Sequence, residues 1–486
     1  MGFHGSCQEI IGFVIINITM KKLETSRRII IIISSAISLA LQVAAYGFLW
    51  FHFYKVMVAK EFWIKGDILM ISIYAVLLLF FSRMYGGTRI GYLKAWEVFF
   101  SEIFAVFCVN VITYAIISLM SAKLVPAQYM LMLMGVDIVW AGIWTASTNG
   151  LYSMLFPPRD MLLVSGNRSN EDILAKFASR PDKYNICKCI NISEGVDAVI
   201  EEFKERYDAM VIWDIPMAER NKLLKYCYGN GVRVYLMPKI PDVLIKGMTE
   251  MHIFDTPMYL TREYSLTIEQ RIGKRCMDLI CSVLLMIIAS PFMLLTAIAI
   301  KLYDGGPVFY KQVRCTEGAK QFKILKFRSM KVDAEKDGKA RLASKNDSRI
   351  TPIGKFIRAT RIDELPQLLN ILKGDMSFIG PRPERPEIIE QYMEEMPEFM
   401  FRMKVKAGLA GYAQVYGKYN TTPYDKLKLD LAYIENYSIW LDLKLLMLTL
   451  KVVLKPESTE GVDQSQTTAL KNHNKSDAED NDKKNE

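Results

Sequence analysis

The sequence predicts three parts in order. They are an α-helical membrane bundle of four TM helices, a Rossmann-like α/β domain, and a mainly α, α/β monotopic domain with a re-entrant membrane helix. Long uncharged stretches fill the first third of the 486 residues, short apolar strands then alternate with polar helical segments, and a proline-interrupted apolar run opens the last part. Hydrophobic residues make up 51% of the chain and mean hydropathy is +0.13, which excludes a disordered chain and a wholly soluble one.

The charge balance indicates anionic partners. The net charge is +9, although residues 457–486 form an acidic tail that we expect to be disordered. The positive excess on the rest of the chain suits phosphates and membrane lipid headgroups. It does not form a basic stripe interleaved with aromatic residues, so we expect no nucleic-acid partner.

We expect residues 29–150 to form a four-helix transmembrane region after a cytoplasmic N-terminal segment, 1–28. The candidate helices are Ile29–Tyr54, Ile68–Ser82, Val98–Met120 and Gln128–Thr148. Lysines and arginines flank them mainly on one side, which predicts that this side and the rest of the chain face the cytoplasm. Lysines in the opposite loop weaken this inference. Glu102 and Asp137 fall inside the apolar runs, and the sequence leaves open whether they act in function or in packing.

Residues 151–265 have the pattern of a small parallel sheet covered by helices. The expected buried strands are Met161–Val164, Ile186–Ile190, Met210–Trp213 and Val232–Met237, with a helix in Ser193–Tyr207. The turn after the first strand carries the single glycine Gly166, whereas a dinucleotide site needs several. We therefore favour a structural, regulatory or oligomerisation module over a cofactor-binding one.

A third domain spans residues 268–456 and opens with the apolar run Leu279–Ile300. Ser290 and Pro291 lie in its middle, where proline removes a backbone donor and should break or kink the helix. Each half is too short to cross a bilayer. We expect a re-entrant helical hairpin at about residues 276–302; the alternative is a fifth crossing.

An acidic pair is the most informative local feature of this domain. Asp363 and Glu364 precede an expected helix, Leu365–Leu372, that starts near Pro366 and ends at Gly374. Such a pair at a helix start is usually a cap. Here arginines flank it, as an anionic substrate would require, and adjacent carboxylates offer one nucleophile and one metal ligand.

Basic residues in two further segments complete this candidate centre. Lys326 and Arg328 follow an expected strand, and Arg382 lies on a proline-bounded turn, Gly380–Glu384. Each alone is typical of a solvated charge. Together they supply several cations to one two-carboxylate centre, which suggests phosphoryl transfer.

From Arg275 to about Leu454 the chain resembles the bacterial sugar transferase family, the polyprenyl-phosphate hexose-1-phosphate transferases. The resemblance rests on short motifs in matching order, namely Lys274-Arg275-Cys-Met-Asp278, Ser290-Pro291, Gly306-Pro-Val-Phe309, Gln312-x-Arg314, Lys326-Phe-Arg-Ser-Met330, Thr351-Pro-Ile-Gly354, Arg361-x-Asp363-Glu364-Leu-Pro366-Gln367, Leu372-Lys-Gly-Asp-Met-Ser377, Gly380-Pro-Arg-Pro383 and Gly408-Leu-Ala-Gly411-Tyr-Ala-Gln414. With the preceding helices and α/β insert, the layout is similar to the large multi-pass branch that initiates exopolysaccharide synthesis.

The resemblance implies transfer of a sugar-1-phosphate from a UDP-sugar to undecaprenyl phosphate with release of UMP. It implies that Asp363 is the nucleophile, forming a covalent phosphosugar, and that Glu364 helps to hold Mg²⁺. The substrate-binding positions carried over from it are Lys326, Arg328, Arg358, Arg361, Arg382 and Gln414. It also implies a multi-pass protein of the bacterial cell membrane with a cytoplasmic catalytic domain. A homo-oligomer stays open.

The sugar is not fixed by these motifs. Thr316 and Ala319 stand where many relatives carry glycines, and Tyr416-Gly417-Lys418 replaces the commoner Asn-Gly-Arg, so glucose and galactose are expectations from the family alone. One competing hypothesis is a metal-dependent glycosyltransferase, whose only Asp-x-Asp candidate is Asp480-Asn-Asp482 in the polar tail. Another is a non-catalytic membrane scaffold or regulator.

Overall fold

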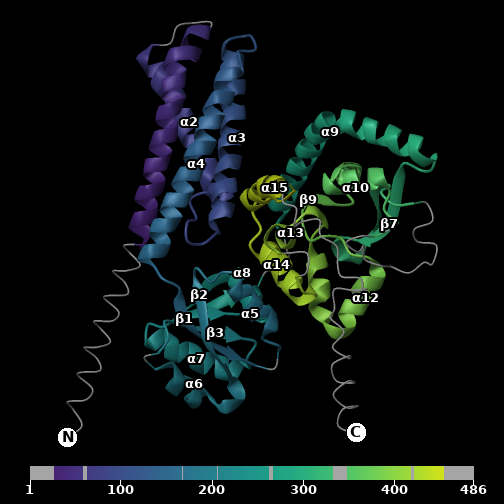
Figure 1. Cartoon of the computed structure of the whole chain (residues 1–486). Coiled ribbons are helices and arrows are strands. Elements are labelled where there is room, and N and C mark those ends of the chain that lie inside the picture. The colour runs from purple at the N-terminus through teal and green to yellow at the C-terminus, as the bar shows by residue number, and fades with distance from the viewer. Residues whose placement is uncertain are drawn as a thin grey trace. The chain divides into compact units, whose positions relative to one another are not determined.

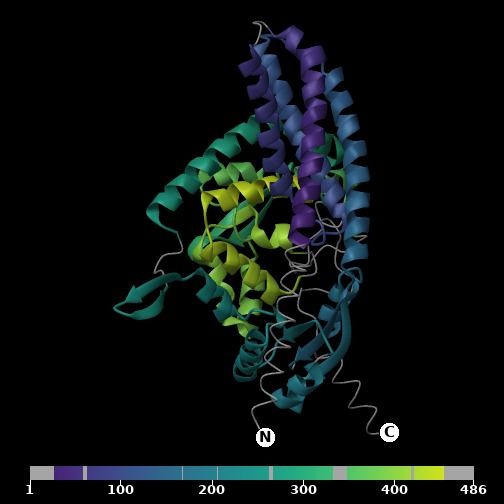
Figure 2. The ribbon, with the colours of Figure 1, turned by 90° about the vertical axis from the view of Figure 1, so that its left-hand side faces the viewer.

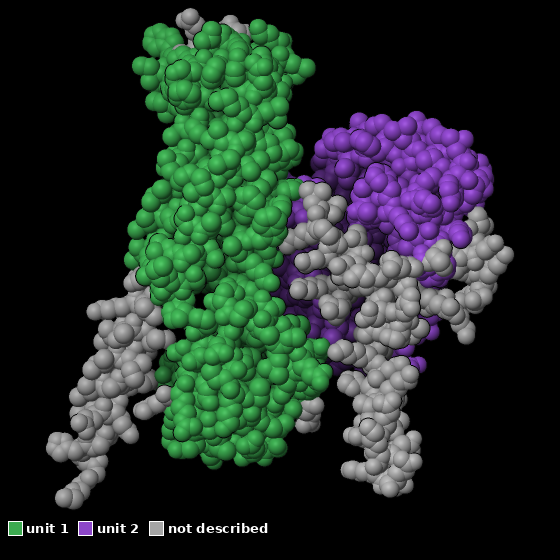
Figure 3. All heavy atoms as spheres, in the orientation of Figure 1, with its two compact units in different colours: residues 1–237 green, residues 238–486 purple. Residues whose placement is uncertain are grey.

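The computed structural model describes residues 27–58, 63–166, 168–204, 206–261, 266–331, 347, 349–417 and 421–453. The calls on the N-terminal segment up to residue 26, on the tail 457–486, and on Lys418 lie outside these residues. The chain forms two compact units, residues 1–237 and 238–486 (Figure 3). It is mainly helical, with small sheets in both units.

Four long apolar helices begin the first unit. They are Arg27–Met57, α2 (Ile64–Tyr85), α3 (Ala95–Met120) and α4 (Gln128–Leu155) (Figure 1). Each is long and apolar enough to cross a membrane, and so is α9 in the second unit. The first helix ends in a π-turn (Trp50–Tyr54) and a 3-10 turn (Lys55–Met57). The helices begin and end within a few residues of the predicted spans; that they cross a membrane stays a prediction.

Polar contacts join these helices from within. Ser34 of the first helix lies 2.9 Å from Thr148 of α4, and the Tyr74 hydroxyl of α2 donates to Asn110 of α3 at 3.1 Å. Glu102 accepts a hydrogen bond from Ser82, and Asp137 lies within reach of Tyr74. Both acids are almost completely buried inside the bundle. Their position suits packing between helices; a further function for them is untested.

The first unit continues into a four-stranded parallel sheet of order β2-β1-β3-β4. Its strands and helices are β1 (Arg159–Ser165), α5 (Glu171–Ala178), β2 (Tyr184–Asn191), η3 (Ile192–Glu194), α6 (Val196–Phe203), β3 (Ala209–Trp213), α7 (Met217–Gly229) and β4 (Arg233–Leu236). The predicted alternation of strands and helices is therefore confirmed. The prediction that all four strands are buried is wrong for the edge strands, since β2 is mostly exposed and β4 is half-buried. The central strands β1 and β3 are buried because both of their faces are covered, as their continuous apolar runs predicted.

The turns that follow β1 and β3 touch each other. A Cβ atom on Gly166 would lie 2.1 Å from the Asp214 carbonyl oxygen. In a sheet of this order the crevice for a ligand opens between these two carboxyl ends. Direct contact of the two turns fills that position at Gly166.

The second unit begins earlier than the predicted domain boundary at residue 265. The first unit ends at Met237, and α8 (Ile240–Gly247) packs on α14 (Pro423–Glu435), with Gly247 against the Glu435 side chain. The hairpin of β5 (Thr249–Ile253) and β6 (Thr256–Leu260) stands apart as a two-stranded ribbon in Figure 2. The apolar pattern of residues 238–261 does not by itself indicate which core they join.

The remaining elements of the second unit pack around a main hydrophobic core, to which α11, α12, α14 and α15 contribute, and a smaller cluster that contains Ile300, Phe327 and Ile357. In chain order they are α9 (Ile268–Asp304), β7 (Phe309–Cys315), η4 (Glu317–Ala319), β8 (Gln321–Phe327), α10 (Pro352–Ala359), η5 (Ile362–Glu364), α11 (Gln367–Lys373), β9 (Ser377–Ile379), α12 (Pro386–Glu395), η6 (Pro397–Lys404), β10 (Gly408–Ala410), α13 (Tyr412–Tyr416), α14 and α15 (Ile439–Val453). β7 and β8 pair antiparallel, and β9 and β10 pair parallel.

Helix α9 runs through Pro291 without a break, and of the two expected outcomes, a break or a kink, only the break is wrong. Pro291 has no N–H to donate to the Ile287 carbonyl, and the Ser290 hydroxyl donates to that carbonyl instead at 2.8 Å. The substitute bond explains how the helix can continue while changing direction along its length (Figure 1). Whether α9 returns to the same side of a membrane stays a prediction.

The contact at Gly166 yields a stability prediction. Gly166→Ala places a methyl group against a backbone carbonyl that cannot move aside, so we expect a loss of about 1–3 kcal/mol in the stability of the α/β part. Hydrogen exchange of the β1 and β3 amides in the full chain would measure it. Gly229→Ala is the control, because its Cβ would meet nothing within 4 Å. Equal exchange in both variants would contradict the prediction.

Candidate active site

The acidic pair lies in a tight turn between two helices. Arg361 adopts the left-handed conformation (φ 57°) at the end of the α10 segment, and the 3-10 turn η5 carries Asp363 and Glu364. Helix α11 begins at Gln367, directly after Pro366, so the pair precedes the helix as expected, separated from it by Leu365 and Pro366. The predicted exit at Gly374, in the left-handed region, is confirmed.

Glu364 is held by two cations from different segments. Its Oε1 accepts from the Lys326 Nζ at 2.9 Å and from the Arg382 guanidinium at 2.8 Å. The side chain of Glu364 is 12% exposed. Burial opposes ionisation, but the charges of Arg382 and Lys326 hold the pKa of Glu364 well below its usual range. Glu364 is thus a fixed anion, and the predicted grouping of Lys326 and Arg382 around the pair is confirmed.

Asp363 has the opposite environment. It is buried, and its Oδ1 has no hydrogen-bond partner among the described residues. Burial and the adjacent charge of Glu364 raise the pKa of Asp363 to about 6, against the opposing charges of Lys326, Arg358 and Arg361. Two neighbouring carboxyl groups whose pKa values are driven apart are typical of divided chemical roles. A carboxyl group with a pKa of about 6 is close to the pH at which it changes charge, and its role in chemistry stays a prediction.

Arg358 and Arg361 act on this turn through their charge. Arg358 lies in the last turn of α10 and is partly exposed, and Arg361 directly precedes η5. Both favour the ionised form of Asp363. The structure therefore brings these two predicted residues to the acidic pair, while their contact with a substrate stays a prediction.

Arg328 and Gln414 have their own local partners. Arg328 pairs with Asp304 at the end of α9 and lies against Gly306, and its Nε and one terminal nitrogen have no partner among the described residues. Gln414 of α13 donates weakly to the Leu409 carbonyl at 3.4 Å, and its buried Oε1 has no partner within the described ranges. Neither residue has a direct contact with Glu364 among the hydrogen bonds and ion pairs of the described residues, so substrate binding by these two residues stays untested.

The first turns of α9 are hydrogen-bonded to two segments of the site. One is the end of α11, which follows the acidic pair, and the other is the strand that precedes Arg382. Arg275 donates to the Ile371 and Leu372 carbonyls at 2.6 and 2.7 Å, which caps the end of α11. Asp278 accepts from the Ser377 hydroxyl and the Phe378 amide, both at 2.9 Å, on the strand that leads to Arg382. One helix therefore fixes the segment after the acidic pair and the segment before Arg382.

A buried ion pair reinforces this connection. Lys274 donates to Asp442 at 2.7 Å and to the Ile379 carbonyl at 2.8 Å, and Tyr433 donates to the other oxygen of Asp442 at 2.7 Å. The side chains of Lys274 and Asp442 are 6% and 0% exposed. The sequence indicated Lys274, Arg275 and Asp278 only as a motif; their partners, 168 residues away for Asp442, have no local signal.

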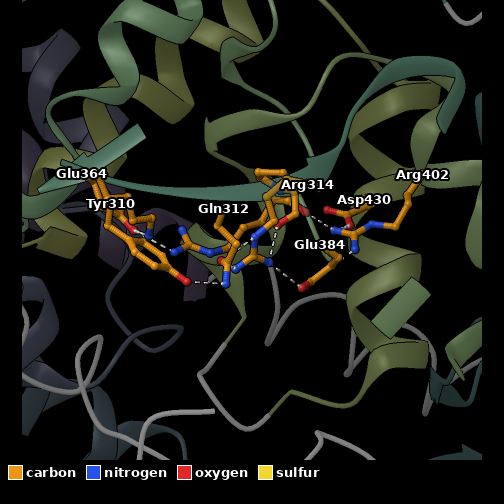
Figure 4. Close-up of polar contacts among 10 residues, drawn as sticks. Tyr310, Gln312, Arg314, Glu364, Glu384, Arg402 and Asp430 are labelled. Carbon is orange, nitrogen blue, oxygen red and sulfur yellow. Dashed lines mark hydrogen bonds and ion pairs between the residues drawn. The ribbon is translucent and has the colours of Figure 1, made fainter. Parts of the chain in front are cut away.

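A second polar network extends from the acidic pair along β7 (Figure 4). Its labelled members, apart from Glu364, are Tyr310, Gln312, Arg314, Glu384, Arg402 and Asp430. Gln312 donates to Tyr310 at 3.0 Å and accepts from Arg314 at 2.7 Å, and Arg402 pairs with Asp430 at 2.8 Å. Sequence reasoning missed Glu384, Arg402 and Asp430, which carry no motif signal beyond their charge.

The described residues offer few ligands for a metal. No group of three or more His, Cys, Asp or Glu side chains lies together anywhere in the described ranges. Asp363 and Glu364 are two adjacent oxygen ligands, and Mg²⁺ is often bound by one or two carboxylates together with substrate phosphates. The Oδ1 of Asp363, which has no hydrogen-bond partner among the described residues, fits that mode of binding.

The buried pair below the site yields a second prediction. Lys274→Met leaves Asp442 charged and unpaired in the core, so we expect a loss of about 3–5 kcal/mol in stability. The double variant Lys274→Met with Asp442→Leu removes both charges and should be clearly more stable than the single one. Thermal unfolding of the full chain in detergent would compare them. A double variant as unstable as Lys274→Met would contradict the prediction.

Comparison with known proteins agrees with this geometry. The family model for bacterial sugar transferases matches residues 269–456. The chain is 38% identical over 255 residues to a UDP-N-acetylgalactosamine-undecaprenyl-phosphate N-acetylgalactosaminephosphotransferase of Aeromonas hydrophila, which covers 51% of the chain and 59% of the relative. It is 42% identical over 210 residues to a UDP-glucose:undecaprenyl-phosphate glucose-1-phosphate transferase of Klebsiella pneumoniae, which covers 42% of the chain and 43% of the relative.

A shorter relative is matched over most of its length. The chain is 38% identical over 190 residues to a UDP-glucose:undecaprenyl-phosphate glucose-1-phosphate transferase of Caulobacter vibrioides, which is 38% of the chain and 71% of that relative. The chain spans about half the length of the first two relatives. Family motifs, the acidic pair with its cations, and these matches lead to one conclusion: the chain belongs to the bacterial sugar transferase family.

Proposed function

We propose that the protein transfers a sugar-1-phosphate from a UDP-sugar to undecaprenyl phosphate and releases UMP. The observation that carries this proposal is the pairing of a buried, unpartnered carboxylate, Asp363, with an adjacent carboxylate, Glu364, that two cations keep ionised. The relatives in Aeromonas, Klebsiella and Caulobacter are transferases named for a UDP-sugar and undecaprenyl phosphate, which supports the proposal. This step would begin the membrane stage of exopolysaccharide or capsule synthesis.

The reaction takes place in two displacements at one phosphorus atom. A carboxylate oxygen of Asp363 attacks the phosphorus that bears the sugar, the bond to the bridging oxygen breaks, and UMP departs with that electron pair. The acyl phosphate that forms is reactive enough to be attacked in turn. An oxygen of the lipid phosphate then attacks the same phosphorus, the bond to Asp363 breaks, and the carboxylate is regenerated.

The cations around the pair stabilise the charge that develops during both steps. Lys326 and Arg382 each use one N–H toward Glu364 and have further donors for phosphoryl oxygens. Arg358 and Arg361 add positive charge near Asp363. Glu364 would hold Mg²⁺ together with substrate phosphates, and the bound ion would neutralise charge on the phosphoryl oxygens.

A membrane position for the site follows from α9. This helix has large exposed apolar side chains such as Ile287, Ile288 and Leu295. Its first turns are hydrogen-bonded to the end of α11 and to the strand before Arg382. An apolar helix of this kind is stable in lipid rather than in water. We place the four N-terminal helices across the bacterial cell membrane, α9 as a re-entrant helix, and the catalytic unit on the cytoplasmic side.

The reaction itself is tested by nucleotide release. Membranes that contain the full chain would receive undecaprenyl phosphate, Mg²⁺ and, in turn, the UDP derivatives of glucose, galactose, N-acetylglucosamine and N-acetylgalactosamine. We expect UMP from one donor, and a loss of at least about a thousandfold with Asp363→Asn because the nucleophile is gone. Lys373→Gln, at a highly exposed lysine, is the control. Release of UDP would instead identify a glycosyltransferase, and no nucleotide from any donor would favour the scaffold hypothesis.

The raised pKa of Asp363 gives the first displacement a defined pH dependence. Below about pH 6 the carboxyl group is protonated and cannot attack, so kcat/KM for the UDP-sugar should fall about tenfold per pH unit and level off above that value. Exchange of labelled UMP into the UDP-sugar without lipid isolates this step from titration of the lipid phosphate. Glu364→Gln removes the neighbouring charge and should move the inflection to lower pH. An inflection that does not move would contradict the assignment to Asp363.

A further inference from the structure

The turn that carries Arg382 has few amides that can hold it. In the sequence Gly380-Pro381-Arg382-Pro383-Glu384, the residues on both sides of Arg382 are prolines and have no N–H. The Gly380 amide donates to the Ala410 carbonyl at 2.9 Å, and the carbonyl oxygens from Pro381 to Glu384 provide further sites at which the turn can be fixed. Arg382 points at Glu364 only while this turn keeps its place.

Every carbonyl from Pro381 to Glu384 accepts a hydrogen bond. The outer two are held by backbone amides, because Gly408 donates to Pro381 at 2.9 Å and Cys315 donates to Glu384 at 3.0 Å. The inner two are held by guanidinium groups. Arg402 donates to the Arg382 carbonyl at 2.9 Å, and Arg314 donates to the Pro383 carbonyl at 3.1 Å.

Both guanidinium groups are themselves fixed in place. The side chain of Arg402 is 6% exposed; it pairs with Asp430 of α14 at 2.8 Å and lies over the Phe399 ring at 4.8 Å. Arg314 donates twice to Gln312, at 2.7 and 3.1 Å, and lies 3.5 Å from Glu384. Figure 4 shows these side chains in one continuous row that leads to Glu364.

We propose that Arg402 and Arg314 are positioning residues, which hold Arg382 against Glu364 by binding the main-chain carbonyls of its turn. Their role in turnover rests on the proposed function. Their role in the turn does not. A planar guanidinium suits the task because it can bind a carbonyl and a carboxylate at once, which a lysine ammonium at the end of a flexible chain does less well.

Hydrogen exchange of the full chain in lipid nanodiscs tests the structural half. In Arg402→Gln we expect the amides of residues 377–385 to exchange about tenfold faster than in the wild type, as for the loss of one buried hydrogen bond. Arg402→Lys should give a smaller increase and guards against a variant that fails to fold. Arg271→Gln is the matched control, since it also removes a guanidinium bond to a carbonyl, that of Leu266, at another place. Unchanged exchange at 377–385 in both Arg402 variants would overturn the proposal.

A double-variant cycle tests the catalytic half. If Arg402 acts through Arg382, Arg402→Lys should lower kcat about tenfold with the KM for the UDP-sugar little changed. In the Arg382→Gln background it should then cost nothing further, whereas a purely structural role would give additive losses. Additive losses would overturn the positioning role. If the wild type transfers nothing from any donor, the proposed function fails, while the exchange experiment still decides whether Arg402 holds the turn, and the same experiment with Arg314→Gln decides it for Arg314.

Discussion

The catalytic unit depends on one buried anion. Glu364 is nearly inaccessible to water, and its charge is tolerable only because Lys326 and Arg382 both reach the same oxygen. These cations come from the end of β8 and from a turn beyond α11, so the ion pair requires two distant segments to meet. Any arrangement that separated them would leave charges buried without partners. The rest of the unit can be understood as the means of keeping both segments in place.

Two sets of contacts keep the segments around Glu364 in place. In helix α9, Arg275 donates hydrogen bonds to carbonyls at the end of α11, and Asp278 accepts a hydrogen bond from the strand before Arg382. The β7 network and α14 hold the other side of the turn through side chains that bind its carbonyls. Because α9 is also the apolar helix of this unit, the same element that would enter the lipid determines the spacing of the acidic pair and Arg382. A change in how α9 lies in the lipid would therefore be expected to change the geometry of the site as well.

Two kinds of feature could be predicted from the sequence: strands that are buried on both faces, and residues that form a motif with their neighbours in the chain. The strands β1 and β3 are buried on both faces and appear as continuous apolar runs, and the acidic pair carries its own motif. The edge strand β2 is mostly exposed, and its extent was underestimated. The partners of Lys274 and Arg402 could not be predicted, because their bonds join distant segments and depend on packing rather than on local pattern. The absence of a break in α9 could not be predicted either, because the Ser290 hydroxyl binds the carbonyl that Pro291 leaves without an amide donor.

The two carboxylates have different partners and different pKa values, and the proposed reaction gives a chemical reason for this difference. A carboxylate that accepts two strong cation bonds is a poor nucleophile, since its electron pairs are already engaged and its pKa is low. Glu364 has both bonds, and Asp363 has an oxygen without a partner among the described residues. Burying an unpartnered carboxylate costs free energy, which appears as its raised pKa, and the cations on Glu364 and the nearby arginines limit that cost. Glu364 thus draws the cations close to the reacting phosphorus while leaving Asp363 free to attack it.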